Sequence, residues 1–255
     1  MTDIFASLSP LHMLAGLAML CASGMLRGFS GYGFAVAAVP LLSLFMPPTA
    51  AVSIVLILQL FISTNNVKET VRLADWRTVK VLVAAAALTT PIGLLLLTRL
   101  PDDVTRLCIA AIVVGTVAVL AVGRRSDQAF TPSKGVTALY GVMSGLSNGL
   151  AGMSGPPVIA YFLATRVPKE RARASMITVF TLSGVCALVP LLIAGEVTLD
   201  MAALALVAVP LVWLSTSLGR RLFLVSSEAV YRWSGLIFLG LTALVLVLKV
   251  LWPGE

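Results

Sequence analysis

Long apolar runs separated by short polar gaps dominate the chain. A run of roughly 20 residues with few charges is long enough to cross a bilayer as a helix. Six runs approach this length, and they begin at residues 49, 79, 104, 174, 201 and 229. The pattern therefore predicts an all-α polytopic membrane protein.

Four shorter apolar runs form two pairs, and a glycine-rich break separates the members of each pair. The first break, Gly28-Phe-Ser-Gly-Tyr-Gly33, joins runs 11–26 and 34–45, and a second, from Gly145 to Pro157, joins runs 135–150 and 156–165. Non-helical backbone survives within a bilayer only where protein buries it or where it lines a cavity. Paired breaks at matching places in two halves therefore indicate a transporter's binding site.

The charges decide how each pair crosses the membrane. Each pair is either one broken span or a re-entrant hairpin that enters and leaves on the same side. Two hairpins place fourteen of the 18 Lys and Arg residues on one side, whereas two broken spans divide them eight against nine. The positive-inside rule favours the hairpins. The fourteen are Lys68, Arg72, Arg77, Lys80, Arg124, Arg125, Lys134, Arg166, Lys169, Arg171, Arg173, Arg220, Arg221 and Arg232.

A hairpin followed by three spans crosses the membrane an odd number of times, so two such units insert in opposite orientations. We therefore predict two inverted repeats with both termini external. The first repeat is 1–123, with hairpin 11–45 and spans 49–67, 79–98 and 104–123. A cytoplasmic connector, 124–134, follows it. The second repeat is 135–255, with hairpin 135–165 and spans 174–194, 201–219 and 229–251.

Internal similarity supports the duplication. A shift of 121 residues aligns Gly24 with Gly145 and Gly28 with Gly149, whereas a shift of 124 superposes Gly-Phe-Ser-Gly on Gly-Met-Ser-Gly. The register of the repeat is therefore open within three residues.

Composition excludes a soluble globule and gives no sign of a cofactor. The chain is 59% hydrophobic and 11% charged, and its mean hydropathy is +1.02, which leaves too little polar surface for a soluble fold. The net charge of +7 lies in short gaps without interleaved aromatics, so nucleic acid is not an expected partner. Three scattered cysteines and one histidine predict no metal site. The first run follows Asp3 rather than a basic start, so we expect it to be retained and not cleaved as a signal peptide.

Arg27 is the main candidate for substrate binding. It ends an apolar run beside the first break, and none of the apolar runs contains an acidic residue to pair with it. A charge within the bilayer costs several kcal/mol unless it faces a cavity or a partner. Arg27 therefore predicts an anionic ligand. The alternative is a shallow hairpin whose arginine snorkels to the surface.

Other groups at the breaks complete the expected site. Helices that begin near Phe34 and Gly155 would direct free N–H groups and positive dipole ends at an anion. Ser154 is placed as an N-cap, and Gln59 either lines a path or bonds between helices. Ser30, Tyr32, Asn148 and Ser154 are the further binding candidates; Gly28, Gly31, Gly33, Gly149, Gly152, Gly155 and Pro156 would shape the site.

The segment from Arg27 to Pro40, with Pro47 and Ala51, resembles the sulfite exporter TauE/SafE family, as does Gly145 to Pro157. This group is also called the toluene sulfonate uptake permeases. The resemblance implies small two-repeat permeases that move sulfur-containing or carboxylate anions across a bacterial inner membrane. The second half departs from a simple copy, with Ser154-Gly155 where the first has Gly33-Phe34.

We therefore expect a secondary transporter that moves a small organic anion or sulfite by alternating access. Without an ATP-binding motif its energy would come from a gradient. The coupling ion, H⁺ or Na⁺, the direction, the exact solute and any homo-oligomer stay open. The rivals are an intramembrane serine protease, suggested by Gly-Met-Ser-Gly at 152–155, and a scaffold. A serine protease needs a base, normally a histidine, and this chain has no histidine after His12. An enzyme is therefore not expected.

Overall fold

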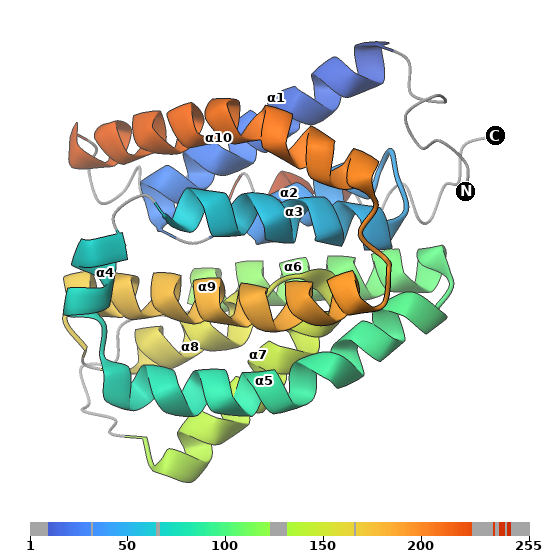
Figure 1. Ribbon diagram of the computed structural model, residues 1–255. Helices are drawn as coiled ribbons and strands as arrows, with labels where there is room; N and C mark the ends of the chain where they lie inside the picture. The colour runs from blue at the N-terminus through green and yellow to red at the C-terminus, as the bar shows by residue number, and fades with distance from the viewer. Residues whose placement is uncertain are drawn as a thin grey trace.

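A computed structural model of the chain describes residues 10–31, 33–64, 67–122, 132–165, 167–225, 237, 240–242 and 244–245. The regular secondary structure of this part is helical, as Figure 1 shows. The described helices are α1 (Pro10–Ser30), α2 (Phe34–Leu42), α3 (Pro48–Ser63), α4 (Val67–Leu73), α5 (Trp76–Arg99), α6 (Asp102–Val122), α7 (Lys134–Ala151), α8 (Gly155–Ala164), α9 (Lys169–Ile193) and α10 (Leu199–Val225).

In the described part of the chain, four helices are long and apolar enough to cross a membrane, within α5, α6, α9 and α10. Their charged residues gather near the helix ends and their long middles are apolar, which confirms the all-α membrane class expected from the sequence. The expected span at 229–251 lies outside the described residues except at a few positions.

Helix α3 is shorter than the run that predicted it. It has 16 residues, or about 24 Å at 1.5 Å per residue, and it ends at Ser63. The seven-residue helix α4, which the hydrophobic pattern did not predict, follows within the polar gap. Most residues of α3 are buried by other helices, so this short helix lies at the centre of the fold.

Glycines in the left-handed conformation produce both breaks. Gly31, with φ of 80°, follows the end of α1, and Gly152, with φ of 63°, follows the end of α7. L-residues with a side chain rarely adopt this conformation, which ends a helix at a defined place. The ends of α1 and α7, and the starts of α2 and α8, are each 121 residues apart, so the boundaries follow the 121-residue shift.

The first helix of each hairpin crosses a helix from the other half. We call α1 with α2 hairpin 1 and α7 with α8 hairpin 2. Helix α1 packs on α10, and α7 packs on α5. A side chain at Gly28 would overlap the Thr216 carbonyl oxygen, and one at Gly149 would overlap the Thr90 carbonyl oxygen. Small residues allow such close backbone approach in membranes. Because the two crossings correspond, they support the repeat that we propose.

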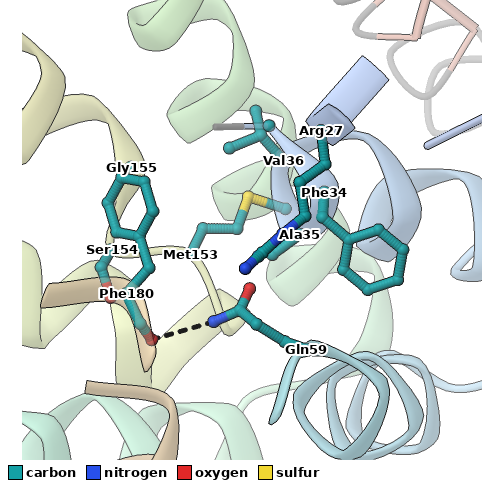
Figure 2. A pocket seen from close by; sticks show the side chains of 10 residues that line it. Arg27, Phe34, Ala35, Val36, Gln59, Met153, Ser154, Gly155 and Phe180 are labelled. Atoms are coloured by element: carbon teal, nitrogen blue, oxygen red, sulfur yellow. Dashed lines mark hydrogen bonds between the residues drawn. The ribbon is translucent and has the colours of Figure 1, made fainter. Parts of the chain in front are cut away.

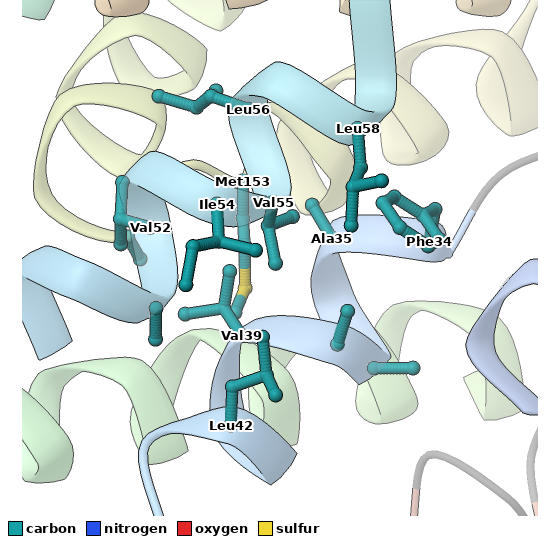
Figure 3. Packing of buried hydrophobic residues seen from close by; sticks show 14 of the residues in the cluster. Phe34, Ala35, Val39, Leu42, Val52, Ile54, Val55, Leu56, Leu58 and Met153 are labelled. Atoms are coloured by element: carbon teal, nitrogen blue, oxygen red, sulfur yellow. The ribbon is translucent and has the colours of Figure 1, made fainter. Parts of the chain in front are cut away.

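Hairpin 1 and α3 share the main apolar core. Figure 3 shows Val39 and Leu42 of α2 facing Ile54 and Val55 of α3, with Met153 of hairpin 2 inserted among them. All these side chains are buried. The core therefore fixes the position of the Met153 segment, between α7 and α8, against hairpin 1 and α3.

Connections between helices gather at two opposite ends of the bundle. At one end, Arg106 of α6 donates from Nε to the Ser43 carbonyl, at 3.0 Å, just after α2. At the other, the Asp75 N–H donates to Ser175 Oγ of α9, at 2.8 Å. Figure 1 shows α4 and the start of α9 at this second end, and the α5–α6 and α9–α10 connections at the first.

Candidate functional site

A small pocket lies where the two hairpin tips meet (Figure 2). Its volume is about 10 Å³, close to the space that a single water needs. Hairpin 1, hairpin 2, α3 and α9 all contribute to its wall. The lining residues are Arg27, Gly33, Phe34, Ala35, Val36, Gln59, Met153, Ser154, Gly155 and Phe180. We call this the tip pocket.

Arg27 reaches the tip pocket from the last turn of α1. Its side chain is buried, with 6% of the residue exposed. Nη2 donates to Ser63 Oγ at 2.8 Å, and this hydroxyl donates to the Gln59 carbonyl at 2.6 Å. Figure 2 shows the guanidinium pointing toward the Gln59 side chain. This burial argues against an arginine that snorkels to the surface.

No carboxylate pairs with Arg27 among the residues that the structure describes. The ion pairs in that part of the chain join Arg106 to Asp102 and Asp103, near the start of α6. An arginine keeps its charge in proteins. A buried cation without a protein carboxylate makes the tip pocket electrostatically suited to an anion.

Two helix N-termini also face the tip pocket. Gly33 and Ser154 are the N-caps of α2 and α8, and neither makes a side-chain cap hydrogen bond. Ser154 occupies the expected cap position, yet its hydroxyl donates to Asn148 Oδ1 at 2.9 Å instead of accepting from the helix. The first N–H groups of a helix have no partner within the helix, so these ends can donate to a bound group.

Asn148 supports the tip pocket from behind. It is fully buried and does not belong to the lining residues. Its Nδ2 donates to the Ser183 carbonyl of α9 at 2.7 Å, while Oδ1 accepts from Ser154. Both ends of the amide are therefore engaged, and Asn148 ties α7 and the start of α8 to α9. In the 121-residue register it corresponds to Arg27, which makes the matching link from α1 to α3.

The remaining expected residues divide into three groups. Gly33 and Gly155 line the tip pocket, and Pro156 lies beside them in the first turn of α8. The other glycines act at a distance: Gly31 and Gly152 end helices, and Gly28 and Gly149 allow the helix crossings. The Ser30 side chain and all of Tyr32 lie outside the described residues.

Sequence reasoning missed several contributors. Met153 and Phe180 line the pocket with no polar signal to mark them. Gln59, for which the sequence left open a path-lining role or a bond between helices, was not missed and has both: it lines the pocket, and its Nε2 donates to the Phe180 carbonyl at 3.0 Å. Arg173 was counted among the loop charges, but the structure places it on α9, with Nη2 donating to the Gly28 carbonyl at 3.3 Å.

A helical membrane protein in which two broken helix pairs meet at a buried charge has the architecture of a membrane transporter. The sequence profile of the sulfite exporter TauE/SafE family matches residues 15–246, and the chain belongs to this family. It is therefore a multi-pass membrane transporter and not an enzyme.

A curated relative supports this assignment. The chain is 27% identical over 218 residues to a Cupriavidus necator protein named probable sulfite/organosulfonate exporter TauE, and the match covers 83% of this chain and 84% of that protein. No solved structure matches the chain.

Proposed function

We propose that this protein is a secondary transporter that moves a small sulfur oxyanion, sulfonate or carboxylate across a bacterial inner membrane. Arg27 carries the proposal, because it is buried at the tip pocket without a carboxylate partner among the described residues. The uncapped starts of α2 and α8 add N–H donors and positive dipole ends at the same place. A guanidinium and two helix ends together suit a compact group with several anionic oxygens.

Sulfite and organic sulfonates are the favoured solutes within this class. The Cupriavidus necator relative is named for sulfite and organosulfonates, and the match extends over most of both chains. A carboxylate also satisfies a guanidinium with two oxygens, so the experiment below compares the two chemistries. The coupling ion, H⁺ or Na⁺, stays open.

The dimensions of the tip pocket support alternating access. About 10 Å³ holds roughly one water, so an oxyanion needs the hairpin tips to separate. Gly155 of hairpin 2 lies against Val36 of hairpin 1, where an added Cβ would be 3.1 Å from Val36 Cγ2. We infer that this contact between tips closes the pocket, and that each hairpin in turn moves away to open it toward one side.

Substitution of Arg27 tests the proposal. Purified protein in detergent is heated with sulfite, methanesulfonate or acetate, and the same anions are offered to proteoliposomes. We expect wild type to gain several degrees in Tm at a concentration about 100 times Kd, because the ligand binds the folded state alone. Arg27→Ala should lose both the shift and transport, and Arg27→Lys should recover only part, since an ammonium lacks the planar fork.

Two outcomes would contradict this proposal. One is a wild-type protein that none of these anions stabilises and that transports none of them. The other is an Arg27→Ala protein that binds and transports as wild type does. Folding of the variant is not expected to suffer, because Ser63 keeps its own bond to the Gln59 carbonyl when the guanidinium is removed. Elution of the variant as a single peak at the wild-type volume provides the control.

A further inference from the structure

A second arginine reaches the tip of hairpin 1 from the other half of the chain. Arg173 lies in the second turn of α9 and donates from Nη2 to the Gly28 carbonyl, at 3.3 Å. Its side chain lies against Gly31, where an added Cβ would be 2.6 Å from Nε. The absence of a side chain at Gly31 therefore makes the room that Arg173 occupies.

Gly28, whose carbonyl accepts from Arg173, directly follows Arg27 in the last turn of α1, so the two arginines lie at the same end of this helix. They belong to different halves of the chain and approach the same break from two helices. Two like charges near each other inside a membrane protein repel, and an anion that contacts both relieves this repulsion. The pair therefore creates a positive field that extends from the tip pocket toward α9.

The position of Arg173 along α9 places it on the way to the tip pocket. Phe180 lies seven positions further along α9, which is about two helical turns, or about 10 Å, on nearly the same face. Phe180 lines the tip pocket. Arg173 lies nearer the start of α9, at the end of the bundle where Figure 1 shows α4, and it is half-buried whereas Arg27 is buried.

The hydrogen bond that Arg173 makes to Gly28 can be exchanged for one to a ligand. At 3.3 Å it is longer than the usual N–H···O distance of about 2.9–3.0 Å. A bond from guanidinium to an anionic oxygen is shorter and roughly twice as strong as a bond between neutral groups. An oxyanion that arrives from the α4 end therefore competes well with the Gly28 carbonyl for Arg173 Nη2.

We propose that Arg173 and Arg27 form a two-arginine relay, in which Arg173 captures the oxyanion at the α4 end and passes it to Arg27 in the tip pocket. This role rests on the proposed anion transport. During the transfer the solute accepts from both guanidinium groups at once. The relay therefore favours a compact group with two or more anionic oxygens on different sides, as in sulfite.

The test measures sulfite transport against sulfite concentration in proteoliposomes that contain the purified full chain. The variants are Arg173→Gln, Arg173→Lys and Arg27→Gln. Arg171→Gln is the matched control, because this residue is exposed, lies on the same part of α9 and loses the same charge. The Arg173→Gln protein should show KM raised roughly tenfold or more, the size expected for one lost charged hydrogen bond, with kcat within about threefold.

Two further readouts separate capture from a structural role. Arg173→Lys should fall between wild type and Arg173→Gln, because it keeps the charge but loses the fork. The difference in KM between wild type and Arg173→Gln should shrink as ionic strength rises, since salt screens the charge that attracts the solute. If Arg173→Gln does not fold, Arg173→Lys carries the test with a smaller expected rise in KM.

The outcomes distinguish the relay from the proposed function. If wild type transports sulfite, Arg27→Gln does not, and Arg173→Gln has the same KM as Arg171→Gln, the relay is wrong while the anion site stands. An Arg173→Gln protein with unchanged KM and a low kcat at every salt concentration also overturns capture. If wild type transports none of the anions, the proposed function fails, and the relay fails with it.

Discussion

Two residues at equivalent places give the hairpins different characters. Arg27 of α1 donates to Ser63 of α3, and Asn148 of α7 donates to the Ser183 carbonyl of α9. The first carries the charge of the site, whereas the second is neutral and uses its other end to accept from Ser154. In the proposed function hairpin 1 therefore supplies the electrostatic attraction for the anion, and the amide of Asn148 holds the start of α8 in place.

Removal of the Asn148 amide should destabilise the protein more than removal of the Ser154 hydroxyl. Asn148→Ala cuts the α7–α9 link and leaves the buried Ser154 hydroxyl without its acceptor, whereas Ser154→Ala loses one bond. Each buried group left unsatisfied costs roughly 1–3 kcal/mol. Thermal unfolding in detergent should therefore rank the Tm values as wild type, then Ser154→Ala, then Asn148→Ala. Equal Tm values for the two variants would show that the link to Ser183 contributes nothing.

At the scale of helices, the hydrophobic pattern predicted most boundaries and none of the pairings. Helices begin at Phe34 and Gly155, as expected, because glycine and proline act locally on the backbone. No feature of the sequence predicted the crossings of α1 with α10 and of α5 with α7. Glycines that end a helix and glycines that allow close packing look alike in a sequence.

The side chains that lie at the tip pocket were predictable only where the chemistry was rare. A lone arginine in an apolar run identified Arg27. Arg173 stands in a loop-like Arg-Ala-Arg segment, so only the fold shows that it reaches Gly28. Ser154 lies at the expected cap position, but the nearby Asn148 amide takes its hydroxyl, a tertiary contact that local sequence does not show.

The crossing of α7 with α5 should tolerate no side chain at its closest point. An added Cβ at Gly149 would lie 2.7 Å from the Leu94 nitrogen and 2.8 Å from the Gly93 Cα, and a helix backbone cannot yield as a side chain can. Gly149→Ala should therefore cost about 1–3 kcal/mol or more and lower Tm by several degrees. Gly115→Ala in α6 is the matched control, because an added Cβ there meets nothing within 4 Å.

The control should leave Tm unchanged or slightly higher, since alanine favours a helix over glycine by about 1 kcal/mol. A Gly149→Ala protein as stable as the Gly115→Ala protein would mean that the two helices separate without cost. The close crossing would then not fix the position of hairpin 2.

At the scale of the whole molecule, the hairpin of each half packs against a long helix of the other half. Helix α1 packs on α10 of the second half, and α7 packs on α5 of the first. Each hairpin is thus held by the other half, and the tip pocket lies where they meet. A rocking motion of one half would consequently carry the other half's hairpin with it, which suits alternating access in inverted repeats.

The membrane orientation follows from the distribution of charge over the two ends of the bundle. We predict that the end with the α5–α6 and α9–α10 connections is external, because most basic residues in the described part of the chain belong to helix segments at the other end. With Cys21, Cys108 and Cys186 first replaced, single cysteines are placed at Asp102, Glu196 and Arg77. An impermeant thiol reagent added to intact spheroplasts should label the first two and spare position 77, whereas all three should react after permeabilisation. Labelling of position 77 from outside would reverse the orientation, and the α4 end, toward which Arg173 lies, would then be external. Labelling of position 102 but not 196 would place these two connections on opposite sides and restore the broken-span arrangement of the short helices.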